Sequence, residues 1–310
     1  MRIVISEFMD GAAVASLAAR FDVTYDPRLV DQRGALRLAL ADADGLIVRN
    51  RTQVDAELLA SAPLLGVVGR LGVGLDNIAV DICAERAIAV IPALGANALA
   101  VAEYVLGTAM LLLRSAYRAT AEVAAGQWPR DRLGGGREIG GKMLGLIGFG
   151  VIGRVTGKLA HGLGMQVIAF DSQIPETSSV WKEEGVAPHP LDYVIANADV
   201  VSLHVPFTAG TRNLLNAERL AKMKHDAVII NTARGGILDE AAVAAALLAG
   251  TLGGAALDVF DDEPLPPGST LAGCPNLILT PHIAGVTRES NVRVSMLIAD
   301  KVAAHLGANP

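Results

Sequence analysis

The sequence predicts an α/β protein built from two doubly wound parallel-sheet domains, and three observations support this fold class. Short apolar runs alternate with longer stretches rich in Ala and Leu from one end of the chain to the other, which is the pattern of a parallel sheet covered by helices on both faces. The alternation occurs in two separate series. A length of 310 residues is also what two ordinary domains require.

The first series occupies about 90 residues, roughly one domain. Its predicted strands are Ile3–Ile5, Val23–Tyr25, Leu46–Val48, Val67–Val68 and Ile88–Ile91. Its predicted helices are Gly11–Arg20, Gly34–Ala41 and Ala56–Ala62, where Ala and Leu recur at helical spacing.

An unusually long helix is predicted next, from Ala98 to Ala125, with Gly126 and Pro129 ending it. We expect it to bridge two domains or to form a dimer contact. The second series then begins at Met143. Its predicted strands are Leu144–Ile147, Val167–Phe170, Val200–Leu203, Val228–Ile230, Ala255–Leu257 and Leu277–Leu279. A final amphipathic helix is predicted over Thr287–Leu306.

Composition excludes several classes of protein. The net charge of -6 argues against a nucleic-acid partner. The two cysteines, Cys83 and Cys274, form no CxxC pair, which fits a reducing cytosol. The long uncharged stretch Ala241–Leu257 is broken at Gly250, whereas a membrane helix needs about 20 strongly apolar residues. We therefore expect a cytoplasmic protein with no membrane segment and no metal site.

The second series opens on a glycine fingerprint. Gly148, Gly150 and Gly153 spell GxGxxG directly after an apolar strand and at the start of a helix, and Asp171 ends the next strand. In a dinucleotide site these glycines permit the tight turn, the close approach of a pyrophosphate and the packing of helix on strand. The aspartate would bind the ribose hydroxyls and repel a 2′-phosphate, which favours NAD over NADP. A glycine-rich turn without a ligand remains the alternative.

Three charged residues follow predicted strands of the second series at their carboxyl ends, where open α/β sheets bind ligands. They are Arg234, Glu263 and His282. Together they suit the oxidation of a 2-hydroxy acid: a histidine takes the hydroxyl proton, a carboxylate orients the histidine, and a guanidinium binds the substrate carboxylate. By pattern alone each could equally be a structural or surface residue.

The chain closely resembles the D-isomer-specific 2-hydroxyacid dehydrogenases, in their phosphoglycerate dehydrogenase-like branch. The resemblance covers essentially the whole chain. It is carried by Gly69–Asn77, the GxGxxG motif, Asn231–Gly236, Ala255–Pro264 and Pro281–Gly285. It implies that Arg234 binds the substrate carboxylate, that Glu263 pairs with His282, and that His282 is the acid and base.

The resemblance also implies two Rossmann- or flavodoxin-like domains, the first of them discontinuous. Residues 1–97 plus 287–310 would form the substrate domain and residues 98–286 the NAD-binding domain, which would also carry a homodimer contact. Because the chain ends soon after the final helix, no serine-binding regulatory domain is expected.

Two groups of binding residues follow from the same resemblance. Beside the three glycines, the cofactor would lie near Val151, Ile152, Asp171, Val205, Pro206, Thr232, Ala233, Asp258 and Gly285. The substrate carboxylate would be held by the backbone around Val73 and Gly74, together with the side chains of Arg234 and His282.

The loop after the third predicted strand carries two arginines, Arg49 and Arg51. A monocarboxylate does not need so much positive charge, so we hypothesise a dianionic substrate such as 3-phosphoglycerate, sulfolactate or a malate-like acid, bound through Arg51. Alternatively, these arginines face solvent or pair with Asp42, Asp44 or Asp55.

Two other functions stay open at this point. One is a glyoxylate or hydroxypyruvate reductase, although Asp171 disfavours the NADP that many of those enzymes use. The other is a non-enzymatic NAD(H)-sensing protein like the family's corepressors, which keep the same fold.

Overall fold

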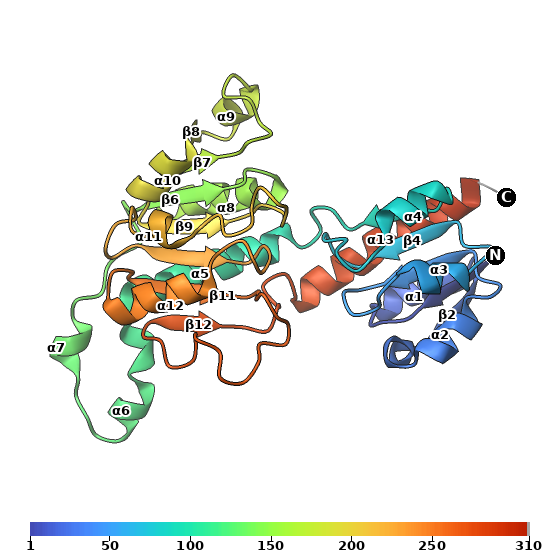
Figure 1. Cartoon of the computed structure of the whole chain (residues 1–310), viewed down its shortest axis with the longest axis horizontal. Helices are drawn as coiled ribbons and strands as arrows, with labels where there is room; N and C mark the ends of the chain where they lie inside the picture. Colours follow the sequence, from blue (N-terminus) through green and yellow to red (C-terminus); the bar gives the residue numbers. More distant parts are fainter. Residues whose placement is uncertain (309–310) are drawn as a thin grey trace. The chain divides into compact units, whose positions relative to one another are not determined.

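The computed structural model describes residues 1–308, which form two compact units. The first unit combines Met1–Asn97 with the segment that begins at Val286, and the second is Ala98–Gly285. Asn309 and Pro310, which the predicted substrate domain includes, lie outside the described residues. Figure 1 shows the elements of both units.

The first unit contains one parallel sheet of five strands in the order β2-β1-β3-β4-β5. The strands are β1 (Arg2–Ile5), β2 (Asp22–Tyr25), β3 (Gly45–Val48), β4 (Val67–Arg70) and β5 (Ala89–Pro92). The helices are α1 (Gly11–Ala18), η1 (Pro27–Asp31), α2 (Arg33–Ala39), α3 (Ala56–Ala60), α4 (Val80–Glu85) and α13 (Arg288–Ala308). This strand order is that of flavodoxin-like domains, so the predicted fold class is confirmed for this unit.

The helix α13 belongs to the first unit although it ends the described chain. Its buried residues Ile298 and Val302 pack against the sheet in one core with Ile3 and Ile5. The contact with β4 is so close that a Cβ on Gly69 would lie 2.7 Å from Ile298 Cγ2. The glycine therefore allows the last helix to cover the sheet formed by the first residues of the chain.

The second unit contains a parallel sheet of seven strands in the order β12-β11-β10-β9-β6-β7-β8. The strands are β6 (Met143–Ile147), β7 (Gln166–Phe170), β8 (Ala187–Pro188), β9 (Val200–Leu203), β10 (Val228–Asn231), β11 (Gly254–Leu257) and β12 (Leu277–Leu279). The helices are α5 (Ala98–Arg114), η2 (Ala116–Arg118), α6 (Thr120–Ala124), α7 (Arg130–Leu133), α8 (Val151–Gly162), α9 (Ser179–Glu183), α10 (Leu191–Asn197), α11 (Ala217–Leu220) and α12 (Glu240–Ala249). The order is that of a Rossmann sheet with one added edge strand.

The structure differs from the sequence predictions at the end of α5 and at β8, and it adds the short helices α4 and α7, which were not predicted. The long helix predicted to run to Ala125 ends at Arg114, because Ser115 adopts a left-handed conformation with φ 56°. That conformation interrupts a right-handed helix, and the chain continues as the short helices η2 and α6. The strand β8 was missed, because two residues, one of them Pro188, carry no periodic signal.

The uncharged stretch Ala241–Leu257, predicted to be broken at Gly250, forms a helix, a stop at that glycine and a buried strand. The helix α12 is capped by the Asp239 carboxylate, which accepts the N–H of Ala242 at 2.9 Å. It ends at Gly250 in the left-handed conformation, and β11 follows. Within residues 1–308, no helix is both long and apolar enough to cross a membrane.

The sheet of the second unit is buried on both faces, as parallel sheets are. Along β10, Ile229 faces one core and Val228 and Ile230 face the other. Asn231 ends this strand as a polar residue that is only 1% exposed. All strands of the sheet are parallel, so their carboxyl ends share one edge. The predicted catalytic residues follow strands at that edge.

Candidate active site

Two of the three glycines in the turn between β6 and α8 are required by the packing of the protein itself. Gly148 has φ 96°, and a Cβ there would lie 2.5 Å from the carbonyl oxygen of His204. A Cβ on Gly153 would lie 2.4 Å from the carbonyl oxygen of Gly148. Gly150 differs, because a Cβ on it would meet no atom within 4 Å. The protein itself does not need a glycine there, whereas an approaching pyrophosphate does.

The amino end of α8 is suited to an anion. Gly150 is its N-cap and supplies no side chain to accept the first N–H groups of the helix. Those groups carry the positive end of the helix dipole. Val151 and Ile152, both predicted cofactor residues, form the first turn of this helix.

Asp171 is bound to the glycine turn. Its Oδ2 accepts the N–H of Phe149 at 2.8 Å, and its Oδ1 accepts the N–H of Gln173 at 2.8 Å. Each carboxylate oxygen has capacity for another donor, so Asp171 can hold the turn and still accept a ribose hydroxyl.

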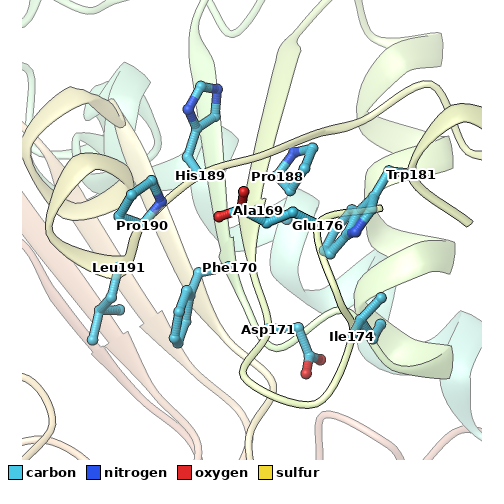
Figure 2. Close-up of a pocket in the computed structure, with 10 residues that line it drawn as sticks. All are labelled: Ala169, Phe170, Asp171, Ile174, Glu176, Trp181, Pro188, His189, Pro190 and Leu191. Atoms are coloured by element: carbon cyan, nitrogen blue, oxygen red, sulfur yellow. The ribbon is translucent and has the colours of Figure 1, made fainter. Parts of the chain in front are cut away.

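A cavity of about 270 Å³ lies beside Asp171 (Figure 2). Its lining residues are Ala169, Phe170, Asp171, Ile174, Glu176, Trp181, Pro188, His189, Pro190 and Leu191. In the view of Figure 2, Phe170 and Trp181 lie on opposite sides, with the Asp171 carboxylate at one end. Apolar and aromatic walls with a few polar groups suit a planar base. The sequence reasoning missed Glu176, a second acidic side chain here, because it lies in an irregular segment outside the fingerprint.

Two predicted cofactor residues follow the neighbouring strands, Val205 after β9 and Thr232 after β10. Val205, which precedes Pro206, would come within 3.0 Å of a Cβ on Gly148. Thr232 carries a buried Oγ1 with no hydrogen-bond partner. An orphaned buried hydroxyl is costly, and a bound ligand would satisfy it. Like the open space at Gly150, this unsatisfied atom fits a bound dinucleotide.

Arg234 lies on a turn that is fixed by Asn231. The Asn231 Oδ1 accepts the N–H of Ala233 at 3.0 Å, and its Nδ2 donates to the carbonyl of Arg234 at 2.9 Å. The Arg234 Nη1 donates to the carbonyl of Ala233 at 2.5 Å. Asn231, which the predicted site did not include, therefore holds the turn that carries Arg234.

The turn of Arg234 packs against the loop that carries Glu263. A Cβ on Gly235 would collide with the carbonyl of Phe260, and Gly236 donates its N–H to Asp261 Oδ1 at 2.6 Å. The loops after β10 and β11 are thereby held together by direct backbone contact.

Glu263 and His282 form the pair that the sequence predicted. The Glu263 Oε2 lies 2.7 Å from His282 Nδ1, and the Glu263 Oε1 accepts the N–H of Phe260 at 3.2 Å. A carboxylate only accepts, so Nδ1 carries the proton and Nε2 of the neutral ring is the free base. Both side chains are a little more than one third exposed, so a substrate can reach the ring.

His282 has a strained backbone that Asp258 holds in place. Its φ is 55°, an uncommon value for a residue with a side chain. The carbonyl of Asp258 accepts the His282 N–H at 2.8 Å, and the carboxylate accepts the N–H groups of Ile283 and Ala284, each at 2.8 Å. Gly285, the last of the predicted cofactor residues, follows this segment directly.

In the first unit, the loop from Arg49 to Thr52 surrounds a buried carboxylate. Glu7, which is 5% exposed, accepts the backbone N–H groups of Arg49 at 2.8 Å, Arg51 at 3.2 Å and Thr52 at 2.9 Å. Asn77 donates to the carbonyls of Arg49 and Thr52 at 3.2 and 2.7 Å. The loop is therefore fixed at both sides.

The two arginines of this loop have different surroundings. Arg49 lies over the ring of Phe8 at 5.6 Å and donates to Asn291, and burial lowers the pKa of its guanidinium. Arg51 is exposed and pairs with Asp31 rather than with Asp42, Asp44 or Asp55. Arg49 is thus the better placed for a desolvated contact with an anion.

The predicted carboxylate-binding residues lie after β4. Val73 and Gly74 are half-buried on an irregular segment. Just before them the guanidinium of Arg70 folds over Gly72, where it occupies the space that a Cβ would need. The structure thus places Arg70, which the predicted site omitted, next to this loop.

The fold and this set of residues define a dinucleotide-dependent dehydrogenase, and the comparisons with known proteins identify the family. The family profile described as D-isomer specific 2-hydroxyacid dehydrogenase, NAD binding domain, matches residues 106–284. The chain belongs to this family. It is an NAD-dependent oxidoreductase that acts on 2-hydroxy acids, and the sequence prediction of its class and cofactor is confirmed.

Three relatives illustrate the similarity. The chain is 53% identical to the (S)-sulfolactate dehydrogenase of Chromohalobacter salexigens, with 98% of each chain covered. It is 39% identical to the D-3-phosphoglycerate dehydrogenase of Methanocaldococcus jannaschii over 85% of this chain and 50% of that one. The crystal structure of TT0316 from Thermus thermophilus superposes with a TM-score of 0.87 at 33% identity, covering 99% and 97% of the two chains.

The neutral histidine next to the glycine turn gives a prediction about acid stability. Burial lowers the pKa of His204 to about 4, and its Nε2 lies 3.0 Å from Ser202 Oγ. The unfolded chain takes up this proton near its ordinary pKa of 6.5, so stability falls as the pH drops from 6.5 towards 4. Between pH 7 and pH 4.5, the free energy of unfolding of His204→Gln should therefore fall by about 2 to 3 kcal/mol less than that of the wild type.

Urea unfolding of wild type and variant at both pH values measures this difference. Other titrating groups are common to both proteins and cancel. Equal loss of unfolding free energy in the two proteins would contradict the depressed pKa of His204.

Proposed function

We propose that this chain oxidises a dianionic 2-hydroxy acid, with (S)-sulfolactate the first candidate, and reduces NAD in the same step. The observation that supports this proposal most directly is the Glu263–His282 pair, in which Nε2 of the histidine is free. The choice of a dianion is supported by the partly buried guanidinium of Arg49 and by the printed activity of the 53% identical relative.

The residues of the second unit would perform the chemistry. His282 Nε2 accepts the hydroxyl proton of the substrate, and the Glu263 carboxylate stabilises the imidazolium that forms. Arg234 binds the substrate carboxylate and polarises the developing carbonyl. Bound NAD supplies the hydride acceptor. In the reverse direction, His282 returns the proton.

The same unit would hold the cofactor. The N–H groups at Val151 and Ile152 and the space at Gly150 suit the pyrophosphate, and Thr232 Oγ1 offers an unsatisfied hydroxyl. Val205, Pro206, Ala233, Asp258 and Gly285 are proposed to line the remainder of the dinucleotide site. Asp171 would accept the ribose hydroxyls, and Glu176 adds a second negative charge against a 2′-phosphate.

The first unit would contribute recognition of the acid. The backbone at Val73 and Gly74 is proposed to bind the substrate carboxylate, and Arg49 rather than Arg51 its second anionic group. Residues 1–97 with the last helix are accordingly proposed as the substrate domain, and residues 98–285 as the NAD-binding domain. Two free thiols, Cys83 and Cys274, support a cytoplasmic location.

We also propose that the chain forms a homodimer through its second unit. Figure 1 shows α6 and α7 on a projection from that unit. Exposed apolar side chains lie on this part of the chain and on the last turns of α5, which precedes it. They are Met110, Leu111, Tyr117, Val123 and Trp128. Such a set of exposed apolar residues is typical of an interface.

Replacement of either residue of the Glu263–His282 pair should lower turnover without preventing cofactor binding. His282→Gln should lower kcat by about 100- to 10,000-fold, because it removes the general base. Glu263→Gln should lower kcat by about 10- to 100-fold, because it removes a charge-assisted hydrogen bond. Steady-state kinetics measure kcat, and NADH fluorescence measures cofactor affinity, which should change by less than about threefold.

The matched control is Asp262→Asn, which neutralises the neighbouring exposed acid. It should leave kcat near the wild-type value. Full activity in His282→Gln would refute the proposed acid and base.

The two arginines of the substrate loop can be separated kinetically. Arg49→Gln should raise KM for sulfolactate by about 10- to 100-fold, the loss expected for a charged hydrogen bond, and should change kcat/KM for lactate by less than about threefold. Arg51→Gln should leave both substrates within about threefold, because its exposed ion pair contributes little. An equal loss on both acids in Arg49→Gln would argue against a dianion contact at this residue.

The dimer can be tested by sedimentation equilibrium. The wild-type chain should sediment at twice the chain mass, and Trp128→Glu should shift it towards the monomer. Leu38→Glu is the control, because Leu38 of the first unit is as exposed as Trp128, 79% in both cases. A monomeric wild-type protein, or equal effects of the two substitutions, would rule out this interface.

A further inference from the structure

The buried carboxylate of Asp258 collects three donors from the segment that carries His282. Its Oδ1 accepts the hydroxyl of Thr280 at 2.6 Å and the N–H of Ile283 at 2.8 Å, and its Oδ2 accepts the N–H of Ala284 at 2.8 Å. Asp258 is 1% exposed. A buried charge is stable only when its hydrogen bonds are made, so the segment and the carboxylate depend on each other.

The hydrogen bond from Thr280 to Asp258 fixes the direction of the bond between Tyr104 and Thr280. Tyr104 OH lies 2.6 Å from Thr280 Oγ1. Thr280 has one hydroxyl proton and gives it to Asp258, which can only accept. Tyr104 must therefore donate to Thr280. The result is a chain of donors from Tyr104 through Thr280 to Asp258, in which each bond polarises the next.

Tyr104 joins this chain of donors from the middle of a helix. It lies in α5, far from either end, and its ring packs against the core beneath the sheet. Burial raises the pKa of its phenol, so the phenol stays protonated as the donor at neutral pH. The chain of donors thereby ties the end of this loop to a helix, which is a rigid element.

We infer that Tyr104 and Thr280 are positioning residues for the dehydrogenase reaction, which hold His282 in its left-handed backbone conformation at Glu263. Neither touches the reacting atoms. A non-glycine residue with positive φ costs about 1 kcal/mol or more and persists only where its surroundings impose it. At His282 (φ 55°) the surroundings are the bonds to Asp258. This inference rests on the proposed role of His282 as acid and base.

The test is a mutational cycle read in kcat, KM and NADH affinity. Thr280→Val keeps the shape of the side chain and removes the hydroxyl. It should lower kcat by about 10- to 100-fold, the effect of a small misplacement of a catalytic group. KM for the acid and NADH affinity by fluorescence should stay within about threefold. Thr280→Ser restores the hydroxyl and should recover kcat to within about threefold.

The second arm of the cycle is Tyr104→Phe, which removes only the terminal hydroxyl. It should lower kcat by about 3- to 10-fold, the effect of one neutral hydrogen bond. Because both residues act through the same chain of donors, Tyr104→Phe should have no further effect on kcat in a Thr280→Val background.

Four outcomes would overturn the inference. They are a wild-type kcat in Thr280→Val, an equal loss in Thr280→Ser, additive losses in the double variant, and a loss of NADH affinity in step with kcat. His282→Ala, measured alongside, separates the two levels of the argument. If it stays active, the proposed function fails and the inference with it; if it is inactive while Thr280→Val is wild type, only the inference fails.

Discussion

The structure of the segment that carries His282, the proposed acid and base, depends on the Asp258 carboxylate. It lies at the carboxyl end of β11, almost inaccessible to water, and accepts hydrogen bonds from Thr280, Ile283 and Ala284. Removing a buried charge's partners costs more than the bonds are worth individually, so the segment has one stable arrangement. That arrangement places Nδ1 of His282 beside Glu263 Oε2 and leaves Nε2 available for the proposed proton transfer.

The same arrangement occurs at two other loops of the proposed site. Asp171 accepts backbone N–H groups from the glycine turn and from its own loop. Glu7 accepts three backbone N–H groups from the loop of Arg49 in the first unit. In each case an acidic residue just after a buried strand organises the irregular backbone around it. Loops at the edge of a parallel sheet lack the ladder of hydrogen bonds that pairs the backbone N–H and C=O groups of strands, so a side chain takes its place. These acidic residues at strand ends therefore stabilise the loops that carry proposed binding residues.

The sequence was sufficient for the fold class, because the strands are continuous apolar runs and the helices are periodic. It also located His282 and Glu263, since both follow strands within recognisable motifs. It failed where tertiary contacts decide the outcome. Nothing local marks Ser115 as the end of α5, and β8 is too short to show a period. The choice between Arg49 and Arg51 required knowledge of Phe8, Asn291 and Asp31, which are distant in sequence.

The central claim is that the Asp258 carboxylate fixes the segment that carries His282. The most direct measurement is the crystal structure of Asp258→Asn, because an amide has one acceptor oxygen and cannot bond all three donors. We expect an unchanged seven-stranded sheet, a displaced segment from Thr280 to Ala284, and loss of the 2.7 Å contact between His282 and Glu263. An unchanged segment with that contact intact would contradict the claim.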